Sequence, residues 1–162
     1  MNLLFVCMGN ICRSPVVEAV VRSEFAHAGL AVDVASAATE SYHIGGHADS
    51  RSIASARAHG YDLSAHRARQ IANEDFAAFD AVLAMDGTNL RALRARCPSG
   101  YALRLALFLP FAGLDTPAEV PDPYYGSAED FERVIQLARS GARGLLARYA
   151  MAHNTQRMQG SP

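Results

Sequence analysis

The sequence contains no lysine, and all 15 of its basic residues are arginines. Three kinds of functional site need a lysine amine and are therefore excluded. These are the P-loop of the G-x-x-x-x-G-K-[ST] type, the pyridoxal Schiff base and the Ser-Lys catalytic dyad. Phosphate chemistry in this chain must therefore use arginine, backbone amides or a metal ion.

Cysteine is scarce, and neither sign of charge is in excess. Three cysteines among 162 residues argue against a secreted disulfide framework and favour reduced thiols in the cytoplasm. The formal net charge of −1 argues against a protein that binds nucleic acid or an anionic membrane through bulk charge. We therefore expect a cytoplasmic protein with neither nucleic acid nor a membrane as its partner.

The chain also lacks an apolar run of the roughly 20 residues that a membrane-spanning helix needs. The N-terminus has no basic segment followed by a long apolar one, so no signal peptide is expected. Half of the residues are hydrophobic (50%), which suffices for one domain with a core. We expect a single domain over residues 1–150 and a flexible tail over 151–162, where apolar residues become rare.

Short apolar runs alternate with amphipathic segments along the chain. The expected strands cover residues 3–7, 31–37, 79–85 and 102–107. The expected helices cover residues 15–28, with Ser14 as N-cap and Pro15 as first helical residue, 49–59, 86–96 and 127 onward. This alternation predicts an α/β fold, a four-stranded parallel sheet flanked by helices on both faces. Such sheets bind ligands at the carboxyl ends of their strands.

The stretch FVCMGNICRSP, residues 5–15, joins the first expected strand to the first expected helix. The backbone amides of a tight loop before a helix can converge on one point and form a nest for an anion. Gly9 permits unusual dihedrals there, and Asn10 tolerates a positive φ. Both the helix terminus and Arg13 would favour a nucleophilic thiolate at Cys7, and Arg13 offers a planar fork for phosphoryl oxygens. The loop therefore predicts phosphoryl transfer through a cysteinyl phosphate.

The string CMGNICRSP resembles the phosphate loop of the low-molecular-weight protein tyrosine phosphatases, whose signature is C-x5-R-[ST]. Further similar segments are SAAT (36–39), SAHRARQI (64–71), VLAMDGTNL (82–90) and DPYYG (122–126). The resemblance spans residues 3 to about 149. It implies a phosphatase that hydrolyses phosphotyrosine in proteins, and aryl phosphate monoesters, through a cysteinyl phosphate.

The resemblance also assigns roles to individual residues. Cys7 is the nucleophile, Arg13 binds phosphate, and Asp122 protonates the leaving group and then activates the water that hydrolyses the phosphocysteine. Acid–base groups of this kind contribute roughly 10²–10⁴-fold. No cofactor or metal is required, and the six histidines show no metal-ligand spacing. The other implied residues are Met8, Gly9, Asn10, Ile11, Cys12 and Ser14 in the phosphate loop, Ser36 and His66 as its support, and Tyr42, Tyr124 and Tyr125 in the substrate cleft.

Some of these residues have a second interpretation. Tyr124 and Tyr125 are also candidates for phosphorylation, and Asp86 is either a helix cap or a site residue. The resemblance implies that Cys12 forms a reversible disulfide with Cys7 and protects it from overoxidation, although a core thiol is the simpler alternative. Cys97 is expected to be an ordinary thiol at a helix end.

Three other functions compete with this prediction. An arsenate reductase of the same fold needs a further redox pair of cysteines downstream, where this chain has only Cys97. A protein-arginine phosphatase tends to carry a small polar residue at the position of Ile11. A non-enzymatic anion or redox module needs no proton donor such as Asp122. We therefore expect phosphotyrosine-containing proteins as partners. A tyrosine kinase, a protein that controls exopolysaccharide and a host protein are open alternatives, and we expect a monomer or weak dimer.

Overall fold

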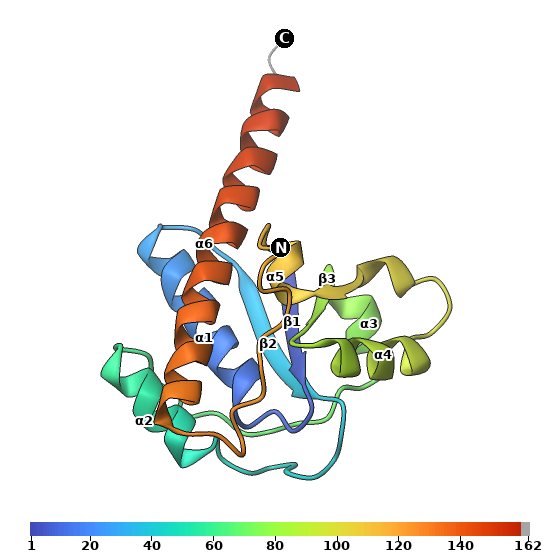
Figure 1. The fold of residues 1–162 in the computed structure, drawn as a ribbon. Coiled ribbons are helices and arrows are strands. Elements are labelled where there is room, and N and C mark those ends of the chain that lie inside the picture. The colour runs from blue at the N-terminus through green and yellow to red at the C-terminus, as the bar shows by residue number, and fades with distance from the viewer. Residues whose placement is uncertain (160–162) are drawn as a thin grey trace.

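The structure, a computed structural model, describes the backbone of residues 1–159 and the side chains of residues 1–152 (Figure 1). Its centre is a sheet of four parallel strands in the order β2-β1-β3-β4. The strands are β1 (Asn2–Cys7), β2 (Asp33–Ala38), β3 (Ala81–Ala84) and β4 (Leu105–Leu107). The predicted four-stranded parallel α/β fold is therefore confirmed.

Strand β1 is apolar throughout because it is buried on both of its faces. Its odd-numbered residues, Leu3, Phe5 and Cys7, belong to one hydrophobic cluster. Its even-numbered residues, Leu4 and Val6, belong to a second cluster on the other face. The alternation of side chains along a strand thus divides the core into two layers.

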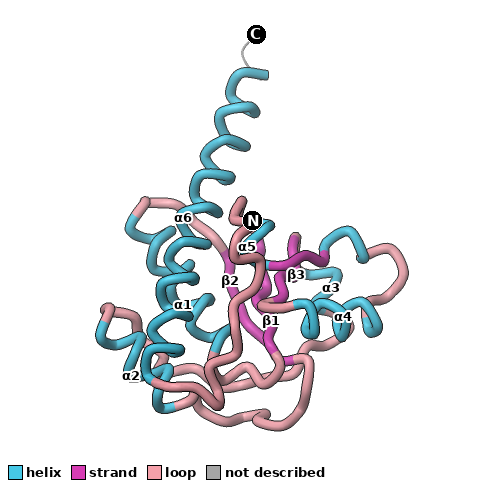
Figure 2. The backbone as a smooth tube through the Cα atoms, in the orientation of Figure 1, coloured by secondary structure: helices cyan, strands magenta, loops and turns pink. Residues whose placement is uncertain are grey.

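The helices cover the two faces of the sheet unequally. The first cluster draws on α1 (Arg13–His27), α2 (Ser50–Ala58), α5 (Phe108–Phe111) and α6 (Ala128–Gln159). The second draws on the short helix α3 (Asp75–Ala78) and on α4 (Gly87–Arg96). Figure 2 shows that the loops following β1 and β2 gather at one end of the sheet, the end where the carboxyl termini of parallel strands meet.

Helix α1 begins earlier than predicted. Cys12 is its N-cap and Arg13 its first residue, so Pro15 occupies the third helical position. Proline is tolerated there because the first-turn N–H groups have no partner within the helix. The predicted N-cap role of Ser14 is wrong, because no side chain caps this helix and the Ser14 hydroxyl bonds elsewhere.

Three short elements escape the sequence prediction: α3, α5 and a 3-10 turn at Ala102–Arg104. Each has only three or four residues, which is too short for a periodic apolar pattern to show. The turn takes the first three residues of the segment expected as the fourth strand, so β4 keeps only Leu105–Leu107.

Helix α6 begins where the SAED stretch predicts. The carboxylate of Asp130 accepts hydrogen bonds from the backbone N–H of Ser127 (2.7 Å) and from its hydroxyl (3.2 Å). The helix continues through Gln159, and Figure 1 shows its last turns extending beyond the rest of the fold. The segment expected to be a flexible tail is therefore helical up to Gln159, and residues 160–162 lie outside the described residues. Its flexibility stays a prediction.

Two glycines let α6 approach α5 closely. A Cβ atom at Gly141 would clash with the ring of Phe108, and one at Gly144 would clash with the backbone carbonyl of Ala112. The ring of Phe108 is fully buried and packs edge-on against Phe5 at 5.3 Å. Glycine at these two positions therefore fixes the distance between α6 and the sheet.

We expect Gly144→Ala to destabilise the protein by ~2 kcal/mol. Alanine gains about 1 kcal/mol of helix propensity, but it must push against a backbone carbonyl that cannot rotate away. Urea denaturation measures the difference. The neighbouring exposed variant Arg143→Ala is the control and should stay within about 0.5 kcal/mol of the wild type. A Gly144→Ala variant as stable as the wild type would contradict this packing.

Candidate functional site

The loop between β1 and α1 encloses the sulfur of Cys7, the last residue of its strand. Cys7 is 3% exposed. Its Sγ lies 3.0 Å from the hydroxyl of Ser14 and accepts a hydrogen bond from the backbone N–H of Asn10 at 3.3 Å. The loop thus places one backbone N–H and one hydroxyl group within hydrogen-bond distance of the sulfur.

Asn10 holds this loop in an unusual conformation. It has a φ of 56°, the only positive φ of a non-glycine residue in the described chain, as the sequence predicts. Its Nδ2 donates to Ser14 Oγ (2.8 Å) and to Ser36 Oγ (2.9 Å), and its Oδ1 accepts from the backbone N–H of Arg69 (3.1 Å). Its carbonyl accepts from His66 Nε2 at 2.7 Å. The structure therefore brings Ser36 and His66 to the loop that they were expected to support.

These contacts also set the direction of the Ser14 hydroxyl. Asn10 Nδ2 donates to Ser14 Oγ, and a thiolate at Cys7 has no hydrogen to give, so in that state the serine hydroxyl is the donor to Cys7 Sγ. At the outer end of the network, Ser36 Oγ donates to Glu18 at 2.5 Å. The sequence analysis missed Glu18, which lies five positions after Arg13 on α1, one helical turn beyond the motif.

The structural role of the glycine at position 9 differs from the predicted one. Gly9 is absent from the residues with positive φ, so the expectation of unusual dihedrals is wrong. A Cβ atom at this position would lie 2.9 Å from Cδ2 of His43, whose imidazole packs directly on the glycine. A side chain at position 9 would therefore force the imidazole of His43 to move. The sequence analysis missed His43, although it follows Tyr42 in the same turn.

Arg13 is the only buried arginine among the described residues, with 2% exposure. Its Nη1 donates to Asp86 Oδ2 (2.6 Å) and to the carbonyl of Val120 (3.1 Å), and its Nη2 lies 3.4 Å from Asp122 Oδ2. Burial alone would lower the pKa of Arg13, but the sulfur of Cys7 and then Asp86 and Asp122 raise it above its ordinary value. The guanidinium therefore stays charged in the interior.

Asp86 combines the two roles that the sequence left open. Its Oδ1 accepts from the backbone N–H of Asn89 at 2.8 Å and caps α4, while its Oδ2 holds Arg13. A single carboxylate thus joins the N-terminus of α4 to a buried cation. Its negative charge interacts favourably with both the positive end of the helix dipole and the guanidinium.

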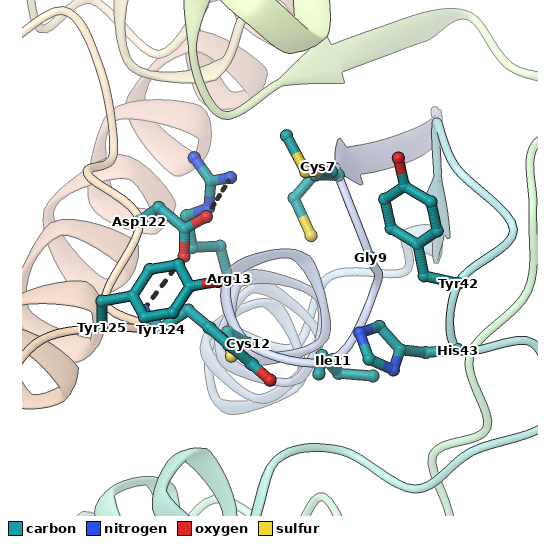
Figure 3. A pocket seen from close by; sticks show the side chains of 11 residues that line it. Cys7, Gly9, Ile11, Cys12, Arg13, Tyr42, His43, Asp122, Tyr124 and Tyr125 are labelled. Atoms are coloured by element: carbon teal, nitrogen blue, oxygen red, sulfur yellow. Dashed lines mark hydrogen bonds and ion pairs between the residues drawn. The ribbon is translucent and has the colours of Figure 1, made fainter.

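Asp122 lies at the mouth of the pocket, in the loop that leads to α6. It is half exposed at 46%. Its Oδ1 accepts from the backbone N–H of Tyr124 at 3.1 Å, so the carboxylate is held between this turn and the guanidinium of Arg13. Figure 3 shows its carboxylate between the guanidinium of Arg13 and the turn that carries Tyr124 and Tyr125.

These residues line a pocket of about 280 Å³. Figure 3 shows Tyr42 and His43 on one side, Tyr124 and Tyr125 on the other, and Cys7 between them. The tyrosines are 69%, 38% and 98% exposed at positions 42, 124 and 125, so two aromatic walls rise above a polar floor. The lining consists of Cys7, Met8, Gly9, Ile11, Cys12, Arg13, Tyr42, His43, Asp122, Tyr124 and Tyr125.

The two remaining cysteines differ in position. Cys12 lines the pocket but is 5% exposed, and Cys97 lies at the end of α4, outside the pocket lining. Burial, followed by the nearby carboxylate of Asp49, raises the pKa of Cys12 to about 12. Cys12 is therefore a neutral thiol near pH 7. Among the described residues, no group of three or more histidine, cysteine or acidic side chains is arranged to hold a metal ion.

Comparisons with known proteins agree with this geometry. The family model for "Low molecular weight phosphotyrosine protein phosphatase" matches residues 2–157. The chain is 42% identical over 151 residues to a low molecular weight protein-tyrosine-phosphatase of Streptomyces coelicolor, covering 90% of this chain and 92% of that protein. It is 40% identical over 149 residues to the low molecular weight phosphotyrosine protein phosphatase of Homo sapiens, covering 90% and 93%.

A solved structure is similar over nearly the whole fold. It is the protein tyrosine phosphatase of Entamoeba histolytica with Hepes in its active site. The TM-score is 0.88 at 37% identity, and the match covers 94% of this chain and 99% of that one.

Because its pKa is about 12, Cys12 should resist alkylation in the folded protein. At pH 7 only about one thiol in 10⁵ would be ionised, and the thiolate is the reactive form. Iodoacetamide labelling followed by peptide mass spectrometry, in a Cys7→Ser background, measures the rate. We expect it to rise about tenfold per pH unit from 7 to 10 and to become fast in urea. A plateau near pH 8.5 in the folded protein would contradict the assignment.

Proposed function

The chain belongs to the low-molecular-weight phosphotyrosine protein phosphatase family, and we propose that it hydrolyses phosphotyrosine in proteins through a phosphocysteine on Cys7. The observation that carries the proposal is the placement of Cys7 Sγ among the Asn10 N–H, the Ser14 hydroxyl and the buried Arg13. A nucleophile on the floor of a nest of donors suits attack on a phosphoryl group, whose oxygens carry the negative charge.

The free edge of Arg13 fits the phosphoryl group. Its Nη1 is committed to Asp86 and Val120, whereas Nη2 has only the long contact with Asp122, and Nε donates no hydrogen bond within the described residues. Nε and Nη2 form one edge of the guanidinium and can bind two phosphoryl oxygens as a fork. The committed edge fixes the orientation of the free one.

In the first step, Cys7 Sγ attacks phosphorus in line with the tyrosyl oxygen. The P–O bond to the phenol breaks, and Asp122 donates its proton to the leaving oxygen. In the second step, a water attacks the phosphocysteine, Asp122 takes its proton, and the S–P bond breaks to return the thiolate and release phosphate. The Ser14 hydroxyl, whose oxygen lies 3.0 Å from the sulfur, donates to the departing thiolate and stabilises it.

The alternatives receive less support. The relatives named above are tyrosine phosphatases. An arsenate reductase would need a downstream redox pair, and only Cys97 follows the loop. Ile11 lines the pocket and gives it an apolar surface that suits a phenyl ring better than a guanidinium.

The wider setting is part of the proposal. We infer that the substrates are phosphotyrosine-containing proteins, with a tyrosine kinase among them, and that the protein works in the cytoplasm as a monomer or weak dimer without cofactor. No helix in the described part of the chain is long and apolar enough to cross a membrane. After peroxide has oxidised Cys7 to a sulfenic acid, the nearby Cys12 thiol can displace water from it and form a disulfide that thiols reverse.

Cys7→Ser should abolish hydrolysis, by roughly 10⁴-fold or more, and still bind phosphate. The serine hydroxyl does not ionise near neutral pH, but the loop amides and Arg13 remain. Release of nitrophenol measures turnover, and calorimetry with inorganic phosphate measures binding. Turnover near the wild-type rate would remove Cys7 as nucleophile.

Asp122→Ala should lower kcat/KM for phenyl phosphate about 10²–10³-fold, because a phenolate needs a proton to leave. Dinitrophenyl phosphate, whose leaving group departs without a proton, should lose less than about tenfold. A series of aryl phosphates measures this dependence. Equal losses across the series would argue against general acid catalysis by Asp122.

Substrate choice should follow the depth and polarity of the pocket. Phosphotyrosine reaches the floor and stacks between the aromatic walls, whereas phosphoserine is too short. Phosphoarginine can reach, but its guanidinium would lose hydration against Ile11. We expect kcat/KM on peptides to be highest for phosphotyrosine and lowest for phosphoserine. Ile11→Thr should reduce the difference in kcat/KM between phosphotyrosine and phosphoarginine. A wild-type preference for phosphoarginine would overturn the assigned substrate but not the cysteine mechanism.

A further inference from the structure

Arg51 does not line the pocket, yet it connects the two loops that do. It is the second residue of α2. Its backbone N–H and Nε donate to Asp49 Oδ1 at 2.9 and 3.0 Å, and its Nη2 donates to Asp49 Oδ2 at 2.9 Å. Its Nη1 donates to the carbonyl of Tyr124 at 3.0 Å. One side of the guanidinium is thus a fork on Asp49, and the remaining nitrogen holds the loop that carries Asp122.

The Asp49 end of this link is anchored on the phosphate loop. The backbone N–H of Asp49 donates to the carbonyl of Ile11 at 2.8 Å, and its carboxylate caps α2. The side-chain hydrogen bond from Arg51 holds the pKa of Asp49 below its usual range. The carboxylate therefore stays ionised, and the fork persists.

The Tyr124 end is anchored next to the proposed acid. The backbone N–H of Tyr124 donates to Asp122 Oδ1 at 3.1 Å, while the carbonyl of the same residue accepts from Arg51. The guanidinium also lies over two rings, 4.5 Å from the centre of Phe131 and 5.5 Å from that of Tyr124. Phe131 is 2% exposed, so Arg51 stacks on a fixed part of the core.

From these contacts we propose that Arg51, held by Asp49, is a positioning residue that sets the distance between Asp122 and Cys7. The continuous path runs from Ile11 through Asp49 and Arg51 to Tyr124, and we call it the Asp49–Arg51 brace. The segment between α5 and α6 has no regular structure of its own, so the position of Asp122 depends on such contacts. Proton transfer is sensitive to the position of the acid, because a small displacement removes the reactive geometry.

This proposal rests on the proposed function, since it concerns the step in which Asp122 gives its proton. We expect Arg51→Ala to lower kcat/KM about tenfold for phenyl phosphate and less than twofold for dinitrophenyl phosphate. The rate of Cys7 alkylation by iodoacetate and the inhibition constant of inorganic phosphate should both stay within twofold, because the phosphate loop and Arg13 are retained.

Three further variants test whether the loss of activity comes from the position of Asp122, from the lost charge of Arg51 or from reduced stability of the protein. Arg51→Lys keeps the charge but has a single nitrogen, which cannot reproduce the two-nitrogen fork on Asp49 together with the bond to Tyr124, and we expect an intermediate loss. Arg57→Ala removes an exposed arginine from the same helix and should match the wild type. In an Asp122→Ala background, Arg51→Ala should cost less than twofold, because the acid that it positions is already gone.

Equal losses of kcat/KM on both aryl phosphates, or weaker inhibition by phosphate, would overturn the brace. So would a full tenfold loss in the Asp122→Ala background, or wild-type behaviour of Arg51→Ala. If urea titrations show that Arg51→Ala does not fold, the Arg51→Lys variant decides instead. Equal losses of kcat/KM on both aryl phosphates in Arg51→Lys would then overturn the brace. Failure of the proposed function is a separate result, because the wild-type protein would then release no phosphate from phosphotyrosine.

Discussion

The buried charge of Arg13 is the constraint on which the site depends. A guanidinium that is 2% exposed must find hydrogen-bond acceptors and negative charge within the protein, because water does not supply them. Asp86, Val120 and Asp122 provide these groups from two different parts of the chain. The burial of one cation thus draws two segments toward the phosphate loop. They are the end of β3 and the loop of residues 112–127 that carries Asp122, which we call the acid loop. Because the guanidinium itself is buried, losing its acceptors would leave a charge without compensation, and this requirement holds the arrangement together.

The phosphate loop is held with similar redundancy. A positive φ costs a non-glycine residue of the order of 1 kcal/mol or more and persists only where the surroundings fix it. The side chain of Asn10 reaches Ser14, Ser36 and the backbone of Arg69, and His66 holds its carbonyl. The hydrogen bonds of the protein itself therefore define the shape of the loop.

The acid loop is organised differently, because it has no helix or strand between α5 and α6. Val120 donates its backbone N–H to the carbonyl of Met85 at 2.8 Å, next to β3, and Arg51 holds the carbonyl of Tyr124. Asp122 lies between these two attachments. A half-exposed carboxylate can thus be rigidly placed and still exchange protons with water, as a group that acts first as acid and then as base requires.

The sequence by itself determined the parts of this protein that depend on neighbouring residues. The apolar run of β1 predicts a buried strand, the asparagine of the loop predicts a positive φ, and Ser127 with Asp130 predicts the start of α6. The family resemblance adds Cys7, Arg13 and Asp122, which the fold brings to one pocket. Local pattern suffices for these features because each is encoded within a few positions.

Only the tertiary structure decided which groups face one another across the fold. The pairs Arg13–Asp86, Arg13–Asp122 and Arg51–Tyr124 are separated by 73, 109 and 73 positions. The same holds for the start of α1, where Ser14 turns to the sulfur instead of capping the helix, and for the imidazole of His43 on Gly9. No periodicity or local propensity encodes such contacts. They exist because packing the helices onto a parallel sheet brings the carboxyl ends of its strands, and the loops that follow them, to a single place.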